Sequence, residues 1–262
     1  MDVLQAVVLG AVQGLTEFLP VSSSGHLILF PALLGWEPQG LVFDITVHAA
    51  TLCAILLALR RDIVDLGLRC WRGEKTARLL VLKLLAATVP VAVVGLLWED
   101  NLLALRTTTA VALSLIGWGL LLALADRYTA MMRGQVSETT KVRWSQALFI
   151  GCLQIFSLIP GTSRSGATIT AGLFSGIDRA TATKFAFLLA VPAILGAAAS
   201  TAIDVSRTGL DLPLDVLGAG FVSALVFGIL AIRLLLLIVK HSTFLGFAIY
   251  RIALGIFVLL YL

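Results

Sequence analysis

The chain has 262 residues, of which 59% are hydrophobic and 13% are charged, and its formal net charge is +4. Soluble domains carry roughly 25% charged residues, so this composition and the mean hydropathy of +1.02 exclude a water-soluble domain and predict a protein of the lipid bilayer. The basic residues form no cluster interleaved with aromatic side chains, so we expect no nucleic-acid partner.

The first apolar segment, residues 3–19, is shorter than the roughly 20 residues that a helical crossing requires, and it stops at Pro20. The break contains a short polar run, Ser22-Ser23-Ser24-Gly25. A second apolar piece runs from about His26 to Leu34. Two half-length helices around such a turn predict a re-entrant hairpin, because irregular backbone is tolerated at membrane depth only where it is buried in protein or lines a wet cavity.

Six later stretches are apolar over a length that can cross a bilayer: about 44–60, 79–97, 108–125, 184–203, 215–238 and 244–262. Between the third and the fourth lies another broken pair, 146–160 and 167–177, which flanks a polar run from Gly161 to Gly166. The sequence therefore predicts an all-α polytopic membrane protein with about six transmembrane helices and two re-entrant helical hairpins.

The two broken pairs are related by one constant offset of 141 residues. Five residues recur identically at that offset: Gly10, Gln13, Ser22, Ser24 and Gly25 return as Gly151, Gln154, Ser163, Ser165 and Gly166. We therefore expect a single integral membrane domain, 1–262, built of two repeats that cover approximately 1–125 and 146–262.

Lysine and arginine are unevenly divided among the connections, and cytoplasmic connections carry the excess in membrane proteins. The basic connections hold Arg60, Arg61, Arg69, Arg72, Lys75, Arg78, Arg127, Arg133, Lys141, Arg143 and Lys240. The alternate connections, 98–107 and 204–215, are poor in such residues. We therefore expect both termini outside the cytoplasm and the two hairpins to enter from opposite faces, which is an inverted-topology repeat with its site near mid-membrane.

Three ionisable residues, Glu17, His26 and Arg164, lie at the expected hairpin turns. An ionisable group inside hydrocarbon costs roughly 2.5–3.5 kcal/mol on insertion scales and usually marks function. Arg164 offers a rigid fork of donors that matches phosphate oxygens. His26 can act as a nucleophile or proton carrier because imidazole titrates near neutral pH. Glu17 can orient His26, act as an acid or base, or hold a divalent cation that bridges the phosphates.

The two polar runs supply hydrogen-bond donors for an anion around these groups. The helix N-terminus after each turn presents free backbone N–H groups, which bind phosphate, and the hydroxyl groups add further donors. The candidate substrate-binding residues are Ser22, Ser24, Gly25, Thr162, Ser163, Ser165 and Gly166. Ser23 lies between two of them and is a candidate nucleophile.

Other polar residues of the apolar segments have a simpler interpretation. A buried serine usually packs between helices, and that role explains Ser22, taken alone, about as well as binding does. His48 lies in mid-span and is interpreted as a packing or supporting residue. Lys83, Arg233 and Arg251 lie near the ends of expected spans, from which long basic side chains extend to the interface.

With these residues in place, the chain resembles the undecaprenyl-pyrophosphate phosphatases, integral membrane enzymes also called bacitracin-resistance proteins. The resemblance rests on GLTEFLPVSSSGH at 14–26 and PGTSRSGAT at 160–168. It extends over nearly the whole chain, including FLLAVP at 187–192 and FAIYR at 247–251. It implies removal of the terminal phosphate of undecaprenyl pyrophosphate, which regenerates the monophosphate carrier for cell-wall polymers. It also implies an active site at Glu17, Ser23, His26, Ser163 and Arg164.

The sequence departs from the family pattern at three positions. Gln13 stands where some members carry a second glutamate, so this chain lacks the second carboxylate of a two-carboxylate metal or acid–base scheme. Ser24 replaces the more usual threonine and keeps the hydroxyl group. Thr162 replaces a bulkier residue, a change that we expect to alter packing more than chemistry.

The sequence leaves the nucleophile open among His26, Ser23 and a water molecule activated by His26. Glu17 is the candidate metal ligand, for Mg²⁺ or Ca²⁺ carried by the pyrophosphate, and no organic cofactor is expected. The expected partners are a polyprenyl pyrophosphate, the lipid bilayer and, in a homodimer, a second copy of the chain. The site is expected to open to the outer, periplasmic face of the bacterial inner membrane. The alternative function is a transporter or flippase of a phosphorylated lipid, since broken helices and inverted repeats are also typical of transporters.

Overall fold

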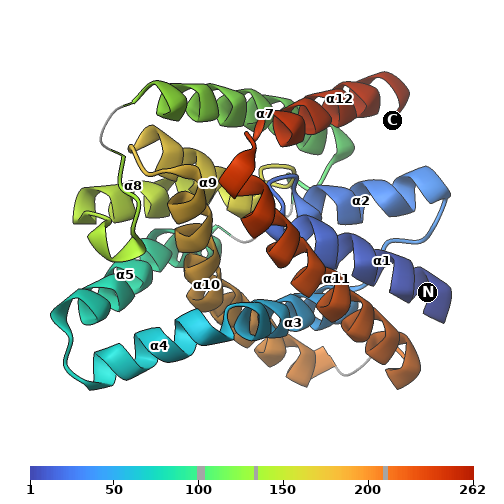
Figure 1. The fold of residues 1–262 in the computed structure, drawn as a ribbon. Coiled ribbons are helices and arrows are strands. Elements are labelled where there is room, and N and C mark those ends of the chain that lie inside the picture. The colour runs from blue at the N-terminus through green and yellow to red at the C-terminus, as the bar shows by residue number, and fades with distance from the viewer. Residues whose placement is uncertain (99–103, 133–134, 209–211) are drawn as a thin grey trace.

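The computed structural model describes residues 1–98, 104–132, 135–208 and 212–262 (Figure 1). Apart from an isolated bridge between Val136 and Ile177, these residues form helices and their connections. The α-helices are α1 (Val3–Phe18), α2 (Ser23–Leu34), α3 (Leu41–Ala58), α4 (Arg60–Trp71), α5 (Lys75–Leu97), α7 (Thr108–Met131), α8 (Trp144–Gln154), α9 (Arg164–Phe174), α10 (Arg179–Thr208), α11 (Leu214–His241) and α12 (Leu245–Tyr261). Two short 3₁₀ segments are η1 (Thr139–Lys141) and η2 (Ile155–Leu158). The all-α fold expected from the sequence is therefore confirmed.

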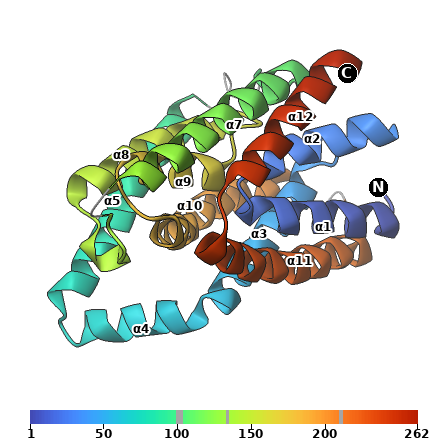
Figure 2. The same cartoon turned by 45° about the horizontal axis from the view of Figure 1, so that its top comes forward.

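Five of the described helices are long and apolar enough to cross a membrane, namely α3, α5, α7, α10 and α11. Each coincides with one of the six expected spans, so the chain is a multi-pass membrane protein. The sixth expected span contains α12, which has 17 residues and is therefore shorter than the roughly 20 residues of a typical crossing. It packs beside α7 (Figures 1 and 2). Arg133 and parts of the connections at 98–107 and 204–215 lie outside the described residues.

Both broken pairs are present, with shorter turns than the sequence indicated. Leu19 precedes Pro20 and has extended dihedral angles, which ends α1, because a residue before proline is disfavoured in the α region. The next helix, α2, begins at Ser23 and not near residue 26. The helix after the second turn, α9, likewise begins at Arg164 and not at 167. The candidate residues after each turn therefore lie in the first turn of a helix.

The two pairs enter the molecule from opposite ends. In Figures 1 and 2, α1 runs from the N-terminus toward the centre, and α2 returns to the end where α1 began. The second pair closes at its other end, where the Gln146 side chain near the start of α8 donates to the carbonyl of Ser175 after α9, at 2.7 Å. The tips of both pairs meet at the centre, where the Ser165 hydroxyl donates to the Leu19 carbonyl at 3.0 Å.

Glycines allow the first helix of each pair to approach a long span closely. A Cβ atom at Gly10 of α1 would lie 2.4 Å from the Gly220 carbonyl oxygen of α11. A Cβ atom at Gly151 of α8 would lie 2.5 Å from the Ala87 carbonyl oxygen of α5. Small residues at such crossings permit the close backbone packing that holds membrane helices together. The recurrence of Gly10 as Gly151 therefore reflects the same packing requirement in both pairs.

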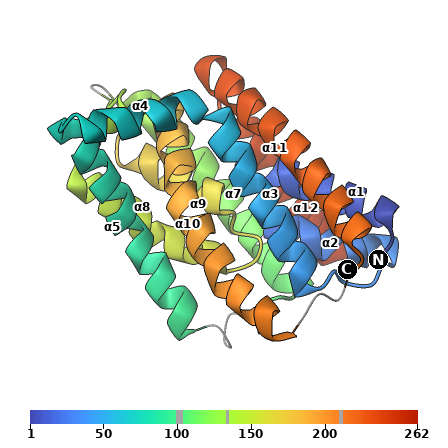
Figure 3. The ribbon, with the colours of Figure 1, turned by 90° about the horizontal axis from the view of Figure 1, so that it is seen from below.

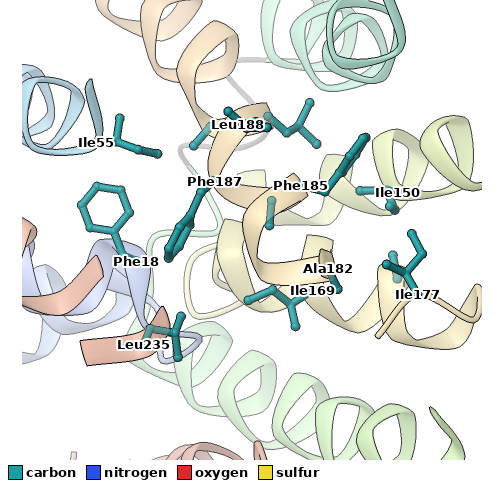
Figure 4. Packing of buried hydrophobic residues seen from close by; sticks show 14 of the residues in the cluster. Phe18, Ile55, Ile150, Ile169, Ile177, Ala182, Phe185, Phe187, Leu188 and Leu235 are labelled. Atoms are coloured by element: carbon teal, nitrogen blue, oxygen red, sulfur yellow. The ribbon is translucent and has the colours of Figure 1, made fainter. Parts of the chain in front are cut away.

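The largest hydrophobic core surrounds α10, which lies between α5 and α8 on one side and α3 and α11 on the other (Figure 3). Phe187 of α10 meets Phe18 of α1 edge-to-face, with ring centroids 5.6 Å apart (Figure 4). Such aromatic pairs contribute about 0.5–1.5 kcal/mol beyond the area that they bury. Because Phe18 directly follows Glu17, this contact fixes the inner end of α1 next to the polar turns.

The basic connection after α3 is largely helical, which the sequence interpretation did not anticipate. It forms α4, whose Val64, Leu68 and Trp71 are exposed. In its last turn, Arg69 Nε donates at 2.7 Å to Oε2 of Glu74, which follows the helix. Hydrogen bonding to Arg69 lowers the pKa of the Glu74 carboxyl group to about 2, so this pair stays ionised at any physiological pH. A helix with one charged and one apolar side is typical of segments that lie along the membrane surface.

Candidate functional site

The two turns adopt the same unusual backbone conformation. Ser22 has φ 77° and Ser163 has φ 72°, and among the described residues these are the only non-glycine positions with positive φ. Each of these serines caps the helix that follows it. Ser22 Oγ accepts from the Gly25 N–H at 3.3 Å, and Ser163 Oγ accepts from the Gly166 N–H at 3.0 Å. Strained serine positions of this kind persist where surrounding contacts hold them, and they cluster at functional sites.

The caps change the expected anion cradle in part. The N–H groups of Gly25 and Gly166 are used by Ser22 and Ser163, so they are not free for a ligand. Within the described part of the chain, four other first-turn N–H groups have no protein acceptor: those of Ser23, Ser24, Arg164 and Ser165. Exposed N–H groups at a helix N-terminus attract anions, so each turn still offers two backbone donors.

Glu17 is the centre of the polar network. It is only 7% exposed, and its Oε2 accepts from Ser23 Oγ at 2.6 Å and from Gln13 Nε2 at 3.0 Å. Its Oε1 accepts from Arg164 at 2.9 Å. A buried carboxylate is stable only when it is paired and hydrogen-bonded. The structure thus joins three of the four candidate catalytic residues in one cluster, across a sequence separation of 147 residues.

Arg164 is held at both ends of its guanidinium group. One terminal nitrogen donates to Glu17, and the other donates to the Ala190 carbonyl of α10 at 3.1 Å. Ala190 lies two residues before Pro192 in a helix that continues through it. A carbonyl oxygen has two lone pairs, so the Ala190 carbonyl can accept from Arg164 in addition to a helical hydrogen bond. The remaining N–H groups of Arg164 can reach an incoming phosphate.

His48 of α3 also belongs to this cluster, whereas the sequence analysis interpreted it as a packing or supporting residue. Its Nε2 lies 3.9 Å from Glu17 Oε2, and its Nδ1 donates to the Asp44 carbonyl at 2.7 Å. Its side chain is 38% exposed, against 15% for Arg164 and 7% for Glu17. An ionisable residue in the middle of a span indicates a functional role. No sequence feature, however, indicated that Glu17 is its neighbour.

His26 does not contact Glu17, so the expectation that Glu17 orients His26 is wrong. His26 Nδ1 lies 2.6 Å from the Ser22 carbonyl, and Nε2 lies 2.7 Å from the Tyr250 hydroxyl. A carbonyl can only accept, so Nδ1 carries the proton, and in neutral His26 the Nε2 atom accepts from Tyr250. The two rings also stack, with centroids 5.8 Å apart. Nε2, the nitrogen that would attack or activate water, is therefore occupied.

Arg251 of α12 donates hydrogen bonds to both turns. The expectation that its side chain extends to the membrane–water interface is therefore wrong. Arg251 is 0% exposed. It donates to the Pro20 carbonyl at 3.1 Å in the first turn, and to the Gly161 and Thr162 carbonyls at 3.0 and 2.7 Å in the second. Longer contacts reach the Leu115 and Ser114 carbonyls of α7. The guanidinium fork provides enough donors for this arrangement.

Gly166 has a second role beside Arg251. A Cβ atom at this position would lie 2.6 Å from Arg251 NH1. The glycine therefore leaves the space that the guanidinium group occupies. Gly161 is restricted more directly, because it has φ 90° and a Cβ atom there would lie 2.4 Å from the Val111 carbonyl oxygen. Glycine is the residue that tolerates such a conformation.

Lys83 is also buried, contrary to the sequence interpretation, while Arg233 is exposed as expected. Lys83 donates to the Val142 carbonyl at 2.6 Å and lies 5.9 Å from the ring of Trp144. These contacts tie α5 to the connection before α8. They lie near the start of α8, away from the two turns, and stabilise the packing of the second pair.

Two buried polar atoms near the turns have no partner in the described part of the chain, Gln13 Oε1 and Thr162 Oγ1. Buried polar atoms without a partner are rare and costly. Gln13 donates to Glu17 with its amide nitrogen, so its free oxygen lies next to the carboxylate. Among the described residues no group of three His, Cys, Asp or Glu residues could hold a metal ion. A cation at this point would depend on Glu17, Gln13 Oε1 and oxygens of the ligand.

The arrangement can bind an anion and perform acid–base chemistry on it. It contains two pairs of backbone N–H donors, an arginine fork and a serine hydroxyl group that donates to a carboxylate. A hydroxyl group within hydrogen-bond reach of a base is the usual form of an activated nucleophile. Positively charged and N–H donors around a transferred phosphoryl group supply most of the catalysis in such reactions.

Comparisons with known proteins agree with this chemistry. The family model described as bacitracin resistance protein BacA matches residues 6–257. The undecaprenyl-diphosphatase of Geobacter sulfurreducens is 44% identical over 271 residues, which cover 100% of this chain and 99% of that protein. The undecaprenyl-diphosphatase of Gemmatimonas aurantiaca is 42% identical and covers 98% of this chain and 97% of its own. That of Geotalea daltonii is 40% identical and covers 100% of this chain and 99% of its own.

Proposed function

Because the chain belongs to the bacitracin resistance protein BacA family, we propose that it is an enzyme that removes the terminal phosphate of undecaprenyl pyrophosphate. The products are undecaprenyl phosphate and inorganic phosphate, so the reaction recycles the lipid carrier of cell-wall polymers. The observation that supports a chemical role most directly is the position of Ser23. Its hydroxyl group lies 2.6 Å from a carboxylate oxygen of Glu17, which also contacts Arg164.

In the proposed first step, Ser23 is the nucleophile and Glu17 is the general base. Ser23 Oγ attacks the terminal phosphorus and its proton passes to Glu17 Oε2. The bond from that phosphorus to the bridging oxygen breaks, and undecaprenyl phosphate leaves with the electron pair. Glu17 then passes this proton to solvent and becomes a carboxylate again. In the second step it accepts a proton from water, whose oxygen attacks the phosphorus of the phosphoserine. The bond between that phosphorus and Ser23 Oγ breaks, phosphate leaves, and Ser23 Oγ takes the proton from Glu17. Glu17 is suited to both steps because it contacts Ser23 directly.

Arg164 and the backbone donors hold the phosphate oxygens. The pyrophosphate carries several negative charges, and these need fixed positive partners in a low-dielectric site. Arg164 provides a planar fork that fits two phosphate oxygens. The free N–H groups of Ser23, Ser24, Arg164 and Ser165 extend this cradle to both turns. Substrate binding thus replaces part of the contact between Arg164 and Glu17, which leaves Glu17 freer to accept a proton.

His26 serves mainly to position the first turn in this scheme. Its Nδ1–H donates to the carbonyl of Ser22, the residue with positive φ. Its Nε2 is occupied by Tyr250. The geometry therefore favours Ser23 over His26 as the nucleophile. The contact with Tyr250 fixes the rotation of α2 and, with it, the direction of the Ser23 hydroxyl group three residues earlier.

A divalent cation that arrives with the pyrophosphate fits beside Glu17. Mg²⁺ and Ca²⁺ prefer oxygen ligands, and Mg²⁺ is commonly held by one or two protein groups together with substrate phosphates. The Glu17 carboxylate and the unpartnered Gln13 Oε1 would be its protein ligands there. When bound, the ion would neutralise charge on the pyrophosphate.

Purified protein in detergent, supplied with undecaprenyl pyrophosphate, tests this function by release of inorganic phosphate. We expect Ser23→Ala to remove turnover and Glu17→Gln to lower it by about 10²–10⁴, the usual contribution of a general base. Ser223→Ala is the matched control, since Ser223 is a buried serine that donates to the Val7 carbonyl between α1 and α11. It should keep normal turnover. Substrate binding without phosphate release by the wild-type protein would favour the lipid carrier instead.

We further propose that the two halves are inverted repeats in the bacterial inner membrane, with the basic end in the cytoplasm. The opposed hairpins and their matched serine turns support this arrangement. The basic connections also meet at one end, where Asp126 accepts from Arg179 and from the N–H of Phe244. Lys184 contacts Asp62 of α4 at the same end. Both chain termini lie at the other end (Figures 1 and 3). The site would then be reached from the periplasmic face.

A further inference from the structure

A groove of about 920 Å³ runs along the inner end of α1 between α11 and α12. Its walls are mainly apolar and include Leu15, Leu19, Val21, Ile238 and Phe247, with Tyr250 at one end. Ser242 and Thr243, in the connection between α11 and α12, lie at the other end, and none of the lining residues is charged. The size is within the range of about 300–1,000 Å³ that is typical of ligand pockets. A groove of this composition suits a hydrocarbon.

The groove is continuous with the polar site at Tyr250. The Tyr250 ring lines the groove, while its hydroxyl group contacts His26 Nε2 at 2.7 Å. Leu19 and Val21 line it from the first turn itself, and the Leu19 carbonyl accepts from Ser165 of the second turn. A molecule whose polar end occupies the two turns would therefore place the adjoining atoms at the mouth of this groove.

We propose that this groove binds the part of the polyprenyl chain next to the pyrophosphate. This inference rests on the proposed function, which supplies a substrate with a charged head and a long apolar tail. From Leu245 to Tyr250, α12 rises by about 7–8 Å, so the groove holds the first isoprene units and the rest of the chain lies in the bilayer. Tyr250, which is 46% exposed, forms the boundary between the polar and apolar parts of the substrate.

Gly246 offers a way to fill the groove without disturbing the packing. It lines the groove, and a Cβ atom there would meet no other atom within 4 Å. Gly246→Trp therefore places an indole ring in the groove while α12 keeps its contacts. Gly218→Trp is the matched control, because Gly218 of α11 is exposed, has the same free space and does not line the groove.

The experiment compares hydrolysis of farnesyl pyrophosphate with that of isopentenyl pyrophosphate, which has a single isoprene unit. We expect Gly246→Trp to raise KM for farnesyl pyrophosphate by about tenfold or more, the effect of filling a hydrophobic pocket. Its kcat/KM for isopentenyl pyrophosphate should stay within about twofold of wild type, as should both values for Gly218→Trp. An equal loss on both substrates, or no loss on farnesyl pyrophosphate, would overturn the proposal. Wild-type cleavage of both substrates at equal kcat/KM would also overturn it while leaving the phosphatase function intact.

A second measurement does not depend on turnover. A farnesyl pyrophosphate analogue with a photoreactive group at the end of its chain is crosslinked to the wild-type protein and mapped by mass spectrometry. We expect crosslinks at residues 15–21 or 238–250, suppressed by excess farnesyl pyrophosphate and unaffected by phosphatidylglycerol. Crosslinks mainly on other helices would refute the site. Equal suppression by phosphatidylglycerol would show a general seat for lipid chains and would refute the assignment to the polyprenyl chain.

Discussion

Replacing Arg251 by lysine tests whether a buried arginine sets the geometry of the whole site. Arg251 has three good hydrogen bonds, to the carbonyls of Pro20, Gly161 and Thr162, and these belong to both turns. Lysine keeps the charge, but its donors all lie on one nitrogen, so it cannot reproduce the fork. We expect Arg251→Lys to lose its contact with at least one turn.

The magnitude follows from the contacts that are lost. A hydrogen bond from a charged donor contributes about 1.5–3 kcal/mol, and a buried carbonyl left without a partner costs a similar amount. Losing the hydrogen bond to one turn should therefore lower the free energy of unfolding by about 1.5–3 kcal/mol. The unfolding midpoint should fall by about 2–4 °C for each kcal/mol lost. Because a shift of about 1 Å in a catalytic group can cost 10²-fold in rate, we expect kcat to fall by about 100-fold while KM changes little.

The assay combines steady-state phosphate release with thermal unfolding in the same detergent. Arg233→Lys is the matched control, since Arg233 is exposed on α11 and, within the described part of the chain, lies outside the hydrogen bonds of the two turns. Gly166→Ala should reproduce the Arg251→Lys kinetics, because the added Cβ atom would lie 2.6 Å from the guanidinium group. An Arg251→Lys protein with wild-type kcat and unfolding midpoint would refute the reasoning. A lower midpoint with unchanged kcat would show that Arg251 stabilises the fold without positioning the site.

Three further predictions concern the nucleophile, the phosphate clamp and the topology. In single-turnover assays, Ser23→Ala should abolish phosphate release, while His26→Ala should retain more activity and near-normal substrate binding; the reverse order would assign attack to His26. Arg164→Lys should lower kcat/KM by about 100-fold or more because a point charge cannot replace the bidentate fork, and near-normal turnover would show that charge alone suffices. In intact cells, Gly40→Cys should react with an impermeant thiol reagent from outside, while native Cys70 should be reached only from the cytoplasm; exchanged labelling would invert the proposed orientation.

The sequence by itself determined the features that depend on local chemistry and on composition. Apolar length predicted the five long helices, because a bilayer imposes the same length on every crossing. Pro20 and the serine and glycine runs predicted the breaks in the two pairs. Proline, glycine and serine disfavour a continuous helix through their own backbone or side-chain chemistry, so their effect is local. The repeat at an offset of 141 residues drew attention to Ser22 and Ser163, which share their dihedral angles and capping contacts. Glu17 and Arg164 were found because charges in an apolar segment are costly.

The partners of these residues were decided only by the tertiary structure. Ser23, three residues before His26 on α2, meets Glu17, whereas His26 meets Tyr250. Which face of a short helix turns toward which neighbour depends on packing against helices far along the chain, and a sequence pattern carries no such information. The same reason explains Arg251, whose position near the end of an expected span suggested that its side chain extends to the interface. Its carbonyl acceptors lie as far as 231 residues away and are free because the turns leave the regular helix. The sequence therefore identified most residues of the site, and the long-range packing of the two broken pairs decided which of them contact one another.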